Sequence, residues 1–321
     1  MSKMTEDVAL ANEWHIAISS KSLAEGMLSA CQVLGQSLVL WRYHGEPIAW
    51  LDLCIHRGAK LSLGEVKNGC VVCPYHGWTY GRDGKCVSIP AQPPNRTISS
   101  KAKTFPVKVK EFWGAIWVCF GDDPVEVPSI PEFENGALRI HVSSHSIRAK
   151  APRIVENYLD FSHLPFIHGN YLGDPEQPLI EDYRVSKSEN GLYAKDLKIY
   201  QPDPDGSGIG GVVSYDYFCY RPLIASFTKM RMRSVLAVTP VDDENSLAWL
   251  IGVNADRDNI SDEEAEKWST LIIEQDAVVV ESQRPELLPL DLQEELHFYF
   301  DRLAIAYRRW LRQLNWTYGV D

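Results

Sequence analysis

Short apolar runs punctuated by glycine dominate the chain between residues 38 and 120. Branched and aromatic residues fill four of them, at 38–41, 48–53, 70–73 and 115–120. Runs of this length and composition predict β-strands, so we expect a small all-β unit. Three prolines then interrupt residues 124–131, where the periodicity is lost. This stretch predicts a domain boundary near residue 130.

The pattern beyond the boundary mixes strands and helices. We predict a strand at 139–147, a helix at 152–164 that Pro165 interrupts, and a series of strands and turns over 181–253. The last third shows the helical period twice, at 262–282 and 290–314. The chain is therefore expected to be α+β, with an all-β domain at 1–130 and a mixed domain at 131–321.

Composition narrows the class of protein. The 321 residues are 45% hydrophobic, which is enough for sizeable cores, and the formal net charge is -11. An acidic chain without a basic patch argues against nucleic acid as a partner. The first residues show no signal peptide and no apolar run is long enough to cross a membrane, so we expect a soluble, cytoplasmic protein. Seven cysteines, an odd count, favour metal ligands or buried thiols over disulfides.

Two pairs of metal ligands lie in the all-β unit. Cys54 and His56 form the first pair, and Cys73 and His76 form the second after 16 intervening residues. Two thiolates on one iron and two imidazoles on the other make a Rieske [2Fe–2S] cluster, which accepts electrons from a ferredoxin or a flavin. Gly58 and Gly77 follow the pairs, and we expect their lack of a Cβ to let backbone N–H groups approach the cluster sulfurs.

A zinc site is the alternative for these four residues, because two thiolates and two imidazoles also hold zinc. Cys70 forms a Cys-x2-Cys with Cys73, but positions three apart on a strand point to opposite faces. We therefore favour the cluster. The remaining cysteines are interpreted as small buried side chains, at positions 31, 70, 86, 119 and 219.

A second set of candidate ligands lies in the mixed domain. Asn157, Asp160 and His163 are spaced by three on the predicted helix, so they share one face. We expect Pro165 to stop this helix and let His168 fold back toward His163. Two imidazoles and one carboxylate form the facial triad of non-haem Fe(II) oxygenases, which leaves positions open for dioxygen.

The carboxylate must come from another segment. Asp276 lies within an apolar stripe of the helix at 262–282 and needs a partner there, so we choose it over Glu274 and Glu281. Without the upstream cluster motif, two hydrogen-bonded core histidines would be the simpler interpretation of His163 and His168. The pair at positions 141 and 145 is interpreted as surface residues.

The order of these motifs resembles that of the catalytic α-subunits of Rieske non-haem iron oxygenases over essentially the whole chain. The resemblance implies a Rieske domain followed by a helix-grip, START-like catalytic domain with an antiparallel sheet and helices. It implies Fe(II) ligation by His163, His168 and Asp276. Asp160 would link a cluster histidine of one subunit to the iron site of its neighbour, Asn157 would lie beside the iron, and the assembly would be a homotrimer.

The short chain is most similar to the α-only group, which includes vanillate O-demethylase, dicamba monooxygenase and phenoxybenzoate dioxygenase. Its ending, at 306–311 and 317–320, also looks like the cyanobacterial hydroxylases of saxitoxin biosynthesis. The resemblance implies hydroxylation or oxidative demethylation of a small organic substrate by O2, with electrons from an NAD(P)H-dependent reductase or a ferredoxin. A cis-dihydroxylating dioxygenase, an electron-transfer protein with a docking domain and a zinc-stabilised binding module are the alternatives.

Two further segments bear on the reaction. The glycine-rich stretch at 206–211 follows a Pro-Asp-Pro-Asp run rather than a strand, so we predict a loop and not a dinucleotide site. The reductase must then be a separate protein. Tyr217, Phe218 and Tyr220 could line a substrate pocket or fill a core, and the sequence leaves both open.

Overall fold

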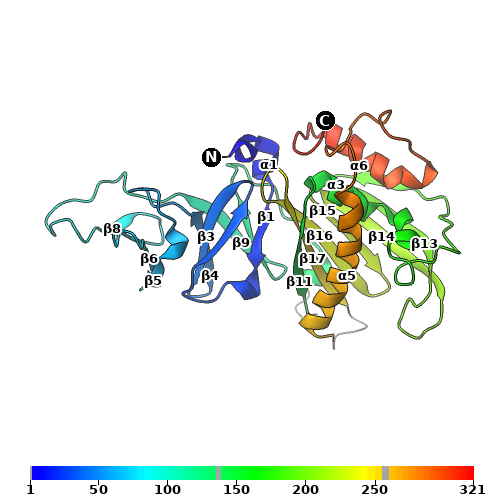
Figure 1. Ribbon diagram of the computed structural model, residues 1–321, viewed down its shortest axis with the longest axis horizontal. Helices are drawn as coiled ribbons and strands as arrows, with labels where there is room; N and C mark the ends of the chain where they lie inside the picture. The colour runs from blue at the N-terminus through cyan, green and yellow to red at the C-terminus, as the bar shows by residue number, and fades with distance from the viewer. Residues whose placement is uncertain (1, 135–138, 255–259) are drawn as a thin grey trace. The chain divides into compact units, whose positions relative to one another are not determined.

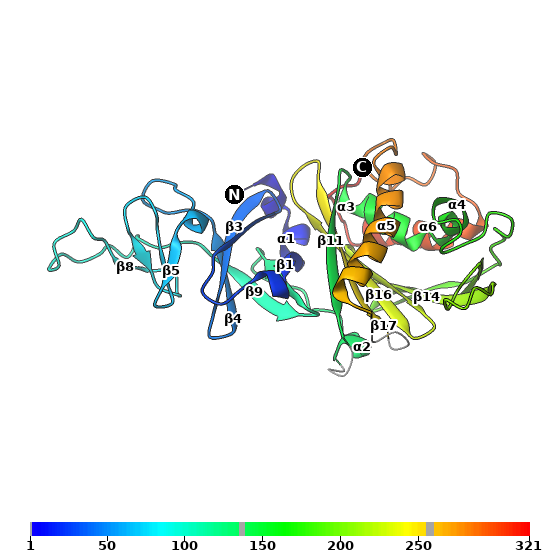
Figure 2. The same cartoon turned by 60° about the horizontal axis from the view of Figure 1, so that its bottom comes forward.

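The computed structural model describes residues 2–134, 139–254 and 260–321, and it divides the chain into two compact units (Figures 1 and 2). The first unit extends to Val125 and the second begins at Glu126. The division falls in the proline-containing stretch, five residues before the predicted boundary. Among the described residues, no helix is long and apolar enough to cross a membrane.

The first unit consists of two antiparallel sheets. Its larger sheet has the strand order β1-β10-β9-β4-β3-β2 and its smaller one the order β5-β6-β7-β8. The strands are β1 His15–Ser19, β2 Ser29–Val33, β3 Gln36–Tyr43, β4 Glu46–Leu51, β5 Glu65–Lys67, β6 Cys70–Val72, β7 Thr79–Tyr80, β8 Cys86–Ser88, β9 Pro106–Phe112 and β10 Ala115–Cys119. The short helical elements are η1 Lys3–Glu6, α1 Val8–Asn12, η2 Ser20–Ser22 and η3 Leu61–Leu63. All four predicted strands are present.

A tryptophan-rich core supports the smaller sheet. Trp41 and Trp50 are fully buried and meet edge to face, with ring centroids 4.3 Å apart. The same apolar cluster includes Tyr80, Cys54 and Cys73. The two candidate cysteine ligands are therefore anchored directly in the hydrophobic core of this unit.

The second unit is a seven-stranded antiparallel sheet with its longer helices on one face (Figures 1 and 2). The strand order is β11-β17-β16-β15-β14-β13-β12. The strands are β11 His141–Ile147, β12 Val185–Ser188, β13 Gly191–Gln201, β14 Gly211–Arg221, β15 Ile224–Lys229, β16 Met232–Pro240 and β17 Ser246–Asn254. The helical elements are α2 Pro131–Glu134, α3 Ala151–Leu159, η4 Phe161–His163, α4 Leu164–Ile167, α5 Asp262–Val280, η5 Tyr299–Asp301 and α6 Arg302–Gln313.

Alternation along β14 separates the two faces of this sheet. Tyr217 is buried and its ring lies near that of Tyr158 on α3, at 6.3 Å between centroids. Phe218 and Tyr220 point to the other face, where their rings stack at 5.9 Å. Of the three aromatic residues that the sequence left undecided, only Tyr217 therefore faces α3.

The last predicted helix is shorter than expected. Residues 290–298 are not helical, and α6 begins only at Arg302. Glu295, which we placed on the helix, instead bonds to Arg153 of α3 and Arg308 of α6. The Arg153 guanidinium also donates to the carbonyl oxygen of Pro285, just before this segment, at 2.8 Å. Tertiary ion pairs thus override the local helical pattern.

A buried salt bridge ties α3 to α6. Glu156 of α3 accepts two hydrogen bonds from the Arg308 guanidinium, at 2.5 and 2.8 Å. Both side chains lie beneath the surface, with Arg308 only 2% exposed. Such a pair is strongly destabilising to break on one side, because the remaining charge has no compensation. It fixes α3, the helix that leads into the second set of candidate ligands.

Candidate metal centres

The first candidate ligand pair lies on a tight loop closed by its own backbone. The Cys54 N–H donates to the carbonyl oxygen of Ala59 at 2.8 Å, and the Gly58 N–H donates back to that of Cys54 at 2.9 Å. Gly58 has a φ of 72°, a value that side-chain-bearing residues rarely adopt. The loop holds a half-buried His56 two residues after the buried Cys54.

The second pair lies on a loop with the same construction. The Cys73 N–H donates to the carbonyl oxygen of Trp78 at 2.8 Å, and the Gly77 N–H donates to that of Cys73 at 3.0 Å. Gly77 has a φ of 70°. Both glycines are therefore needed for the turn, and their N–H groups bond to carbonyl oxygens. The backbone N–H groups that approach a sulfur, as we expected, are instead those of Tyr75 and His76, which bond to Cys73.

Other groups surround the two sulfurs. The Tyr80 hydroxyl lies 3.1 Å from Cys54 Sγ. The backbone amides of Tyr75 and His76 donate to Cys73 Sγ, which favours its thiolate, although burial raises the pKa of this thiol. Each cysteine is only 2% exposed. The thiol pair is thus deeply set and hydrogen-bonded, as a ligand pair of a cluster must be.

The two histidines of this unit lie side by side. Their ring centroids are 4.6 Å apart, and the His56 ring stacks on Trp78 at 4.5 Å. Nδ1 of His56 is buried and has no hydrogen-bond partner among the residues that the structure describes. Partial desolvation, with the charges of His76 and Arg57, lowers the pKa of His56. A neutral ring with an unpartnered nitrogen fits a metal ligand.

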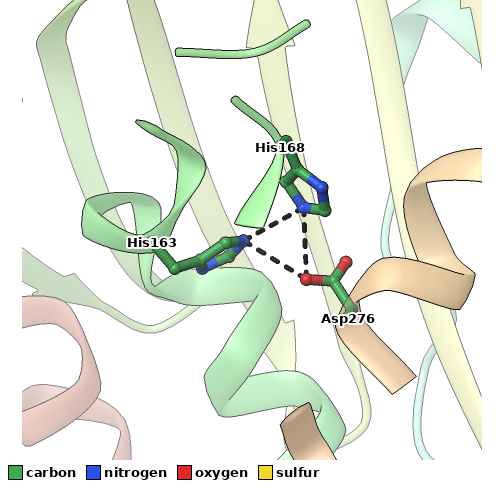
Figure 3. A group of neighbouring side chains, drawn as sticks. All are labelled: His163, His168 and Asp276. Carbon is green, nitrogen blue, oxygen red and sulfur yellow. Dashed lines mark hydrogen bonds and ion pairs between the residues drawn. The ribbon is translucent and has the colours of Figure 1, made fainter. Parts of the chain in front are cut away.

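The second candidate centre brings together three side chains from distant segments. Figure 3 shows His163, His168 and Asp276 pointing toward one another. The two Nε2 atoms are 3.3 Å apart, and Asp276 Oδ1 lies 3.4 Å from Nε2 of His163 and 3.1 Å from Nε2 of His168. His168 is 1% exposed and Asp276 is 7% exposed. The predicted trio is therefore assembled in a largely buried position.

These spacings suit a metal ion. Metal bonds of about 2.1 Å at right angles place neighbouring ligand atoms about 3.0 Å apart, close to the three observed distances. Among the described residues, this trio is the one group of His, Cys, Asp or Glu side chains whose ligand atoms all lie within 4.8 Å of one another. Two nitrogens and one carboxylate oxygen on one side leave the opposite side free for other ligands.

The chain reaches this geometry through a break that the sequence prediction misplaced. The helix α3 ends at Leu159, and Asp160 adopts an extended conformation with ψ of 99°. His163 then lies in the short η4, and Pro165 falls within the first turn of α4 rather than ending a helix. The Asp160 carboxylate accepts from the Ser162 N–H at 2.8 Å, which caps the new turn and explains the break.

Asn157 and Asp160 each approach one member of the trio. The Asn157 amide nitrogen is 3.4 Å from Asp276 Oδ1, a weak contact that orients this carboxylate. The second carboxylate oxygen of Asp160 lies 4.0 Å from Nδ1 of His163, and its side chain is 36% exposed. Asp160 thus connects the buried centre with the surface of the second unit.

The rival residues lie elsewhere. Glu274 is exposed, and Glu281 accepts from the backbone N–H of Arg148 at 2.9 Å. His141 lies 2.9 Å from Asp262, and His145 is half-buried against Ser143. The last two are not simple surface residues, because β11 packs against α5 through a bond of 2.8 Å between Ser143 and Ser269.

Several residues near the trio carry no signal that our sequence prediction used. Gln275 Oε1 lies 2.8 Å from Nδ1 of His168. Aromatic rings cluster behind Asn157 and Asp160, with centroid distances of 5.5 Å between Tyr158 and Phe227 and 6.1 Å between Phe161 and Tyr217. Tyr158 and Phe161 sit in the same segment as the predicted ligands. Their position directly beside Asn157 and Asp160 could have marked them.

The two buried histidines differ in electrostatics. Burial lowers the pKa of His163 by more than the charges of Asp160 and Asp276 raise it. Burial also disfavours the charged form of His168, but the hydrogen bond and charge of Asp276, with help from Gln275, leave its pKa raised. Asp276 therefore favours the charged form of His168 more than that of His163.

The chain is similar to known families over both units. A family model described as the Rieske [2Fe-2S] domain matches residues 13–111, and one described as the vanillate O-demethylase oxygenase C-terminal domain matches residues 147–315. The methylxanthine N1-demethylase NdmA of Pseudomonas putida is 32% identical over 95% of this chain and 89% of its own length.

Two further comparisons agree with this. The methylxanthine N3-demethylase NdmB of Pseudomonas putida is 31% identical over 88% of this chain and 82% of its own length. The solved structure of Pseudomonas putida CBB5 NdmA with caffeine superposes with a TM-score of 0.83 at 29% identity, and the match covers 98% of this chain and 92% of that one.

Proposed function

Because the chain belongs to the Rieske non-haem iron oxygenases, we propose that it removes a methyl group from the nitrogen of a small heteroaromatic substrate. Family membership makes it a monooxygenase that hydroxylates or oxidatively demethylates a small organic substrate, and that receives electrons through a separate reductase. The electron-carrier and zinc-module alternatives are therefore set aside. N-demethylation as the particular reaction is the proposal.

The observation that carries the proposal is the long match to two N-demethylases, with 95% and 88% of this chain covered. A feature of the chain itself supports it. The rings of Tyr158, Phe161, Tyr217 and Phe227 form one aromatic cluster, and two of them neighbour Asn157 and Asp160 in the sequence. Flat aromatic substrates pack well against such rings.

We propose that His163, His168 and Asp276 hold the mononuclear iron and that Cys54, His56, Cys73 and His76 hold the cluster. The ligand-atom spacings of 3.1 to 3.4 Å in the first set, and the unpartnered Nδ1 of His56 in the second, support these roles. The iron supplies activation of dioxygen, and the cluster supplies the electrons. The residues of the chain orient the ligands and exclude water.

The overall reaction balances as a monooxygenation. One atom of O2 enters a C–H bond of the N-methyl group, and the other leaves as water after two electrons and two protons are taken up. The resulting N-hydroxymethyl compound then loses formaldehyde by cleavage of its C–N bond, and the nitrogen recovers a proton. In this scheme Asn157, which lies 3.4 Å from Asp276, holds the carboxylate in position.

We also propose that the chain acts as a homotrimer in which Asp160 links a cluster histidine of one subunit to the iron site of its neighbour, so that electrons pass from cluster to iron between subunits. The exposed position of Asp160 and of His76 supports this. Charge supports it as well, because residues 1–125 carry 13 basic and 11 acidic side chains whereas residues 126–321 carry 19 and 32. A slightly basic unit and a strongly acidic one are suited to meet between subunits. The cytoplasmic location stays a prediction.

A product assay tests the proposed reaction. Purified protein with a generic NADH-dependent reductase is given caffeine, theobromine or vanillate, and NADH, O2 and formaldehyde are followed together. We expect one formaldehyde for each NADH consumed with an N-methyl compound and none with vanillate, whose methyl group is on oxygen. Formaldehyde from vanillate alone would instead assign O-demethylation.

A further inference from the structure

The two histidines of the trio differ in one contact, because only His168 bonds to the side chain of Gln275. Nδ1 of His168 lies 2.8 Å from the side-chain oxygen of Gln275, whereas its Nε2 faces Asp276 Oδ1 at 3.1 Å. A neutral imidazole carries one N–H. When that hydrogen sits on Nδ1 and bonds to the amide oxygen, the lone pair of Nε2 points toward the other two ligand atoms.

His163 has no corresponding bond to another side chain. Among the described residues its Nδ1 has only a weak contact with the backbone of Asp160, and the Asp160 carboxylate oxygen is 4.0 Å away. The hydrogen position on the His168 ring is therefore set by a side chain of another helix, whereas that on the His163 ring depends on its own segment. This asymmetry assigns a particular task to Gln275.

The helix α5 delivers the glutamine and the acid together. Gln275 and Asp276 are consecutive, so one rigid turn sets both side chains against His168. His168 itself follows the end of α4 in a non-helical conformation, with φ of -107° and ψ of 32°. Its own backbone does not belong to a regular element, so a contact from α5 is well placed to orient the ring.

We propose that Gln275 is a positioning residue that holds His168 in the tautomer whose Nε2 binds the metal. The proposal rests on the iron site proposed above. The side-chain amide of Gln275 is neutral, so it orients the His168 ring without adding charge beside Asp276. A carboxylate at this position would keep the acceptor but add a charge, and an aliphatic side chain would remove the acceptor.

Metal affinity tests the proposal without turnover. Protein with an intact cluster is freed of mononuclear iron with a mild chelator and dialysed anaerobically against graded Fe(II), and iron beyond the two cluster irons is measured. Loss of an outer hydrogen bond to a metal-bound histidine typically weakens binding 10- to 100-fold. We expect this loss for Gln275→Leu and for Gln275→Met, whereas Gln275→Glu should bind at least as tightly as the unchanged protein.

The control is Glu274→Leu, at the neighbouring exposed position of the same helix, which should leave Fe(II) affinity unchanged. Equal affinity of Gln275→Leu and the unchanged protein overturns the proposal. So does equal weakening in the Leu, Met and Glu variants, because that would indicate a packing role. If the unchanged protein binds only its cluster irons, the iron site itself is wrong, and this result is distinct from both.

Discussion

The two candidate metal centres are built in opposite ways. The four residues of the first lie within positions 54–76, on two loops that each close through their own backbone bonds. The trio of the second joins His163 and His168 to Asp276, which lies 108 positions after His168. The first centre is therefore a product of local turns, and the second exists only when the whole second unit has folded.

The two centres also differ in how far their histidines are buried. His76 is exposed, whereas His168 is 1% exposed. An exposed imidazole suits a group that exchanges electrons with other proteins, and a buried one suits a reaction that must exclude water. The comparison shows that local turns bring together the residues of the first candidate centre, whereas the buried second centre depends on tertiary structure.

The largest expected effect separates the two centres directly. His163→Ala should lower turnover by at least about 1000-fold, because the proposed iron loses one of its three ligands. The visible spectrum of the cluster should not change. Iron analysis should fall from three to two per chain, and a variant that keeps three irons or full turnover would contradict the assignment of His163.

Mixed subunits provide the control for this variant. Cys73→Ser should remove the cluster but leave the trio intact, so it too should be inactive alone. If electrons cross between subunits, a mixed assembly of the two inactive variants should recover part of the turnover. No recovery in demonstrated mixed trimers would place electron transfer within one chain.

The next effect concerns the second unit only. Arg308→Leu should lower the free energy of unfolding by about 3 kcal/mol, because the buried Glu156 loses its hydrogen-bonded partner and keeps only the more distant Arg153, at 3.6 Å. The urea midpoint of the chain measures this loss. Arg309→Leu, at the exposed neighbouring position, is the matched control and should shift the midpoint little. Similar midpoints for both variants would show that the salt bridge does not hold α3.

The smallest effect concerns acid stability of the first unit. Burial lowers the pKa of His15 to about 4, against a weaker opposing effect of its bond to the carbonyl oxygen of Leu10. Between about pH 6.5 and 4, His15 is protonated in the unfolded chain but neutral in the folded one. The free energy of unfolding therefore falls as the pH falls through this range. The loss should reach about 3 kcal/mol.

A substitution isolates this contribution. His15→Gln should flatten the dependence of the urea midpoint on pH between 7 and 4, measured from the loss of cluster absorbance. Parallel pH curves for the unchanged protein and the variant would show that His15 is not the group responsible.

The sequence predicted what depends on local pattern. The strand at 70–73 and the helix from Asp262 appear almost as expected, because alternation and helical period act over a few neighbouring residues. The cluster motif was recognised for the same reason. Asp276 was chosen because a carboxylate in an apolar stripe needs partners, and the structure places it beside the two histidines. The likeness to the saxitoxin-pathway hydroxylases stays a prediction.

The errors have a common physical cause. The break at Asp160 depends on a capping bond to Ser162, and the irregular segment before α6 depends on ion pairs of Glu295 with Arg153 and Arg308. Helical period was present in both stretches, but competing hydrogen bonds and ion pairs decided the backbone. Gln275 was missed because its partner, His168, is 107 positions away in the chain.

The matching construction of the two cysteine loops has a practical consequence. Each loop closes with the same pair of backbone bonds, and a short hairpin of β5 and β6 connects them. Segment 54–78 therefore closes through its own backbone bonds. From the rest of a protein it requires only an apolar surface that buries its two thiols. If this segment is inserted into another small antiparallel sheet whose core contains tryptophan, we expect the new protein to bind a redox cluster at its surface.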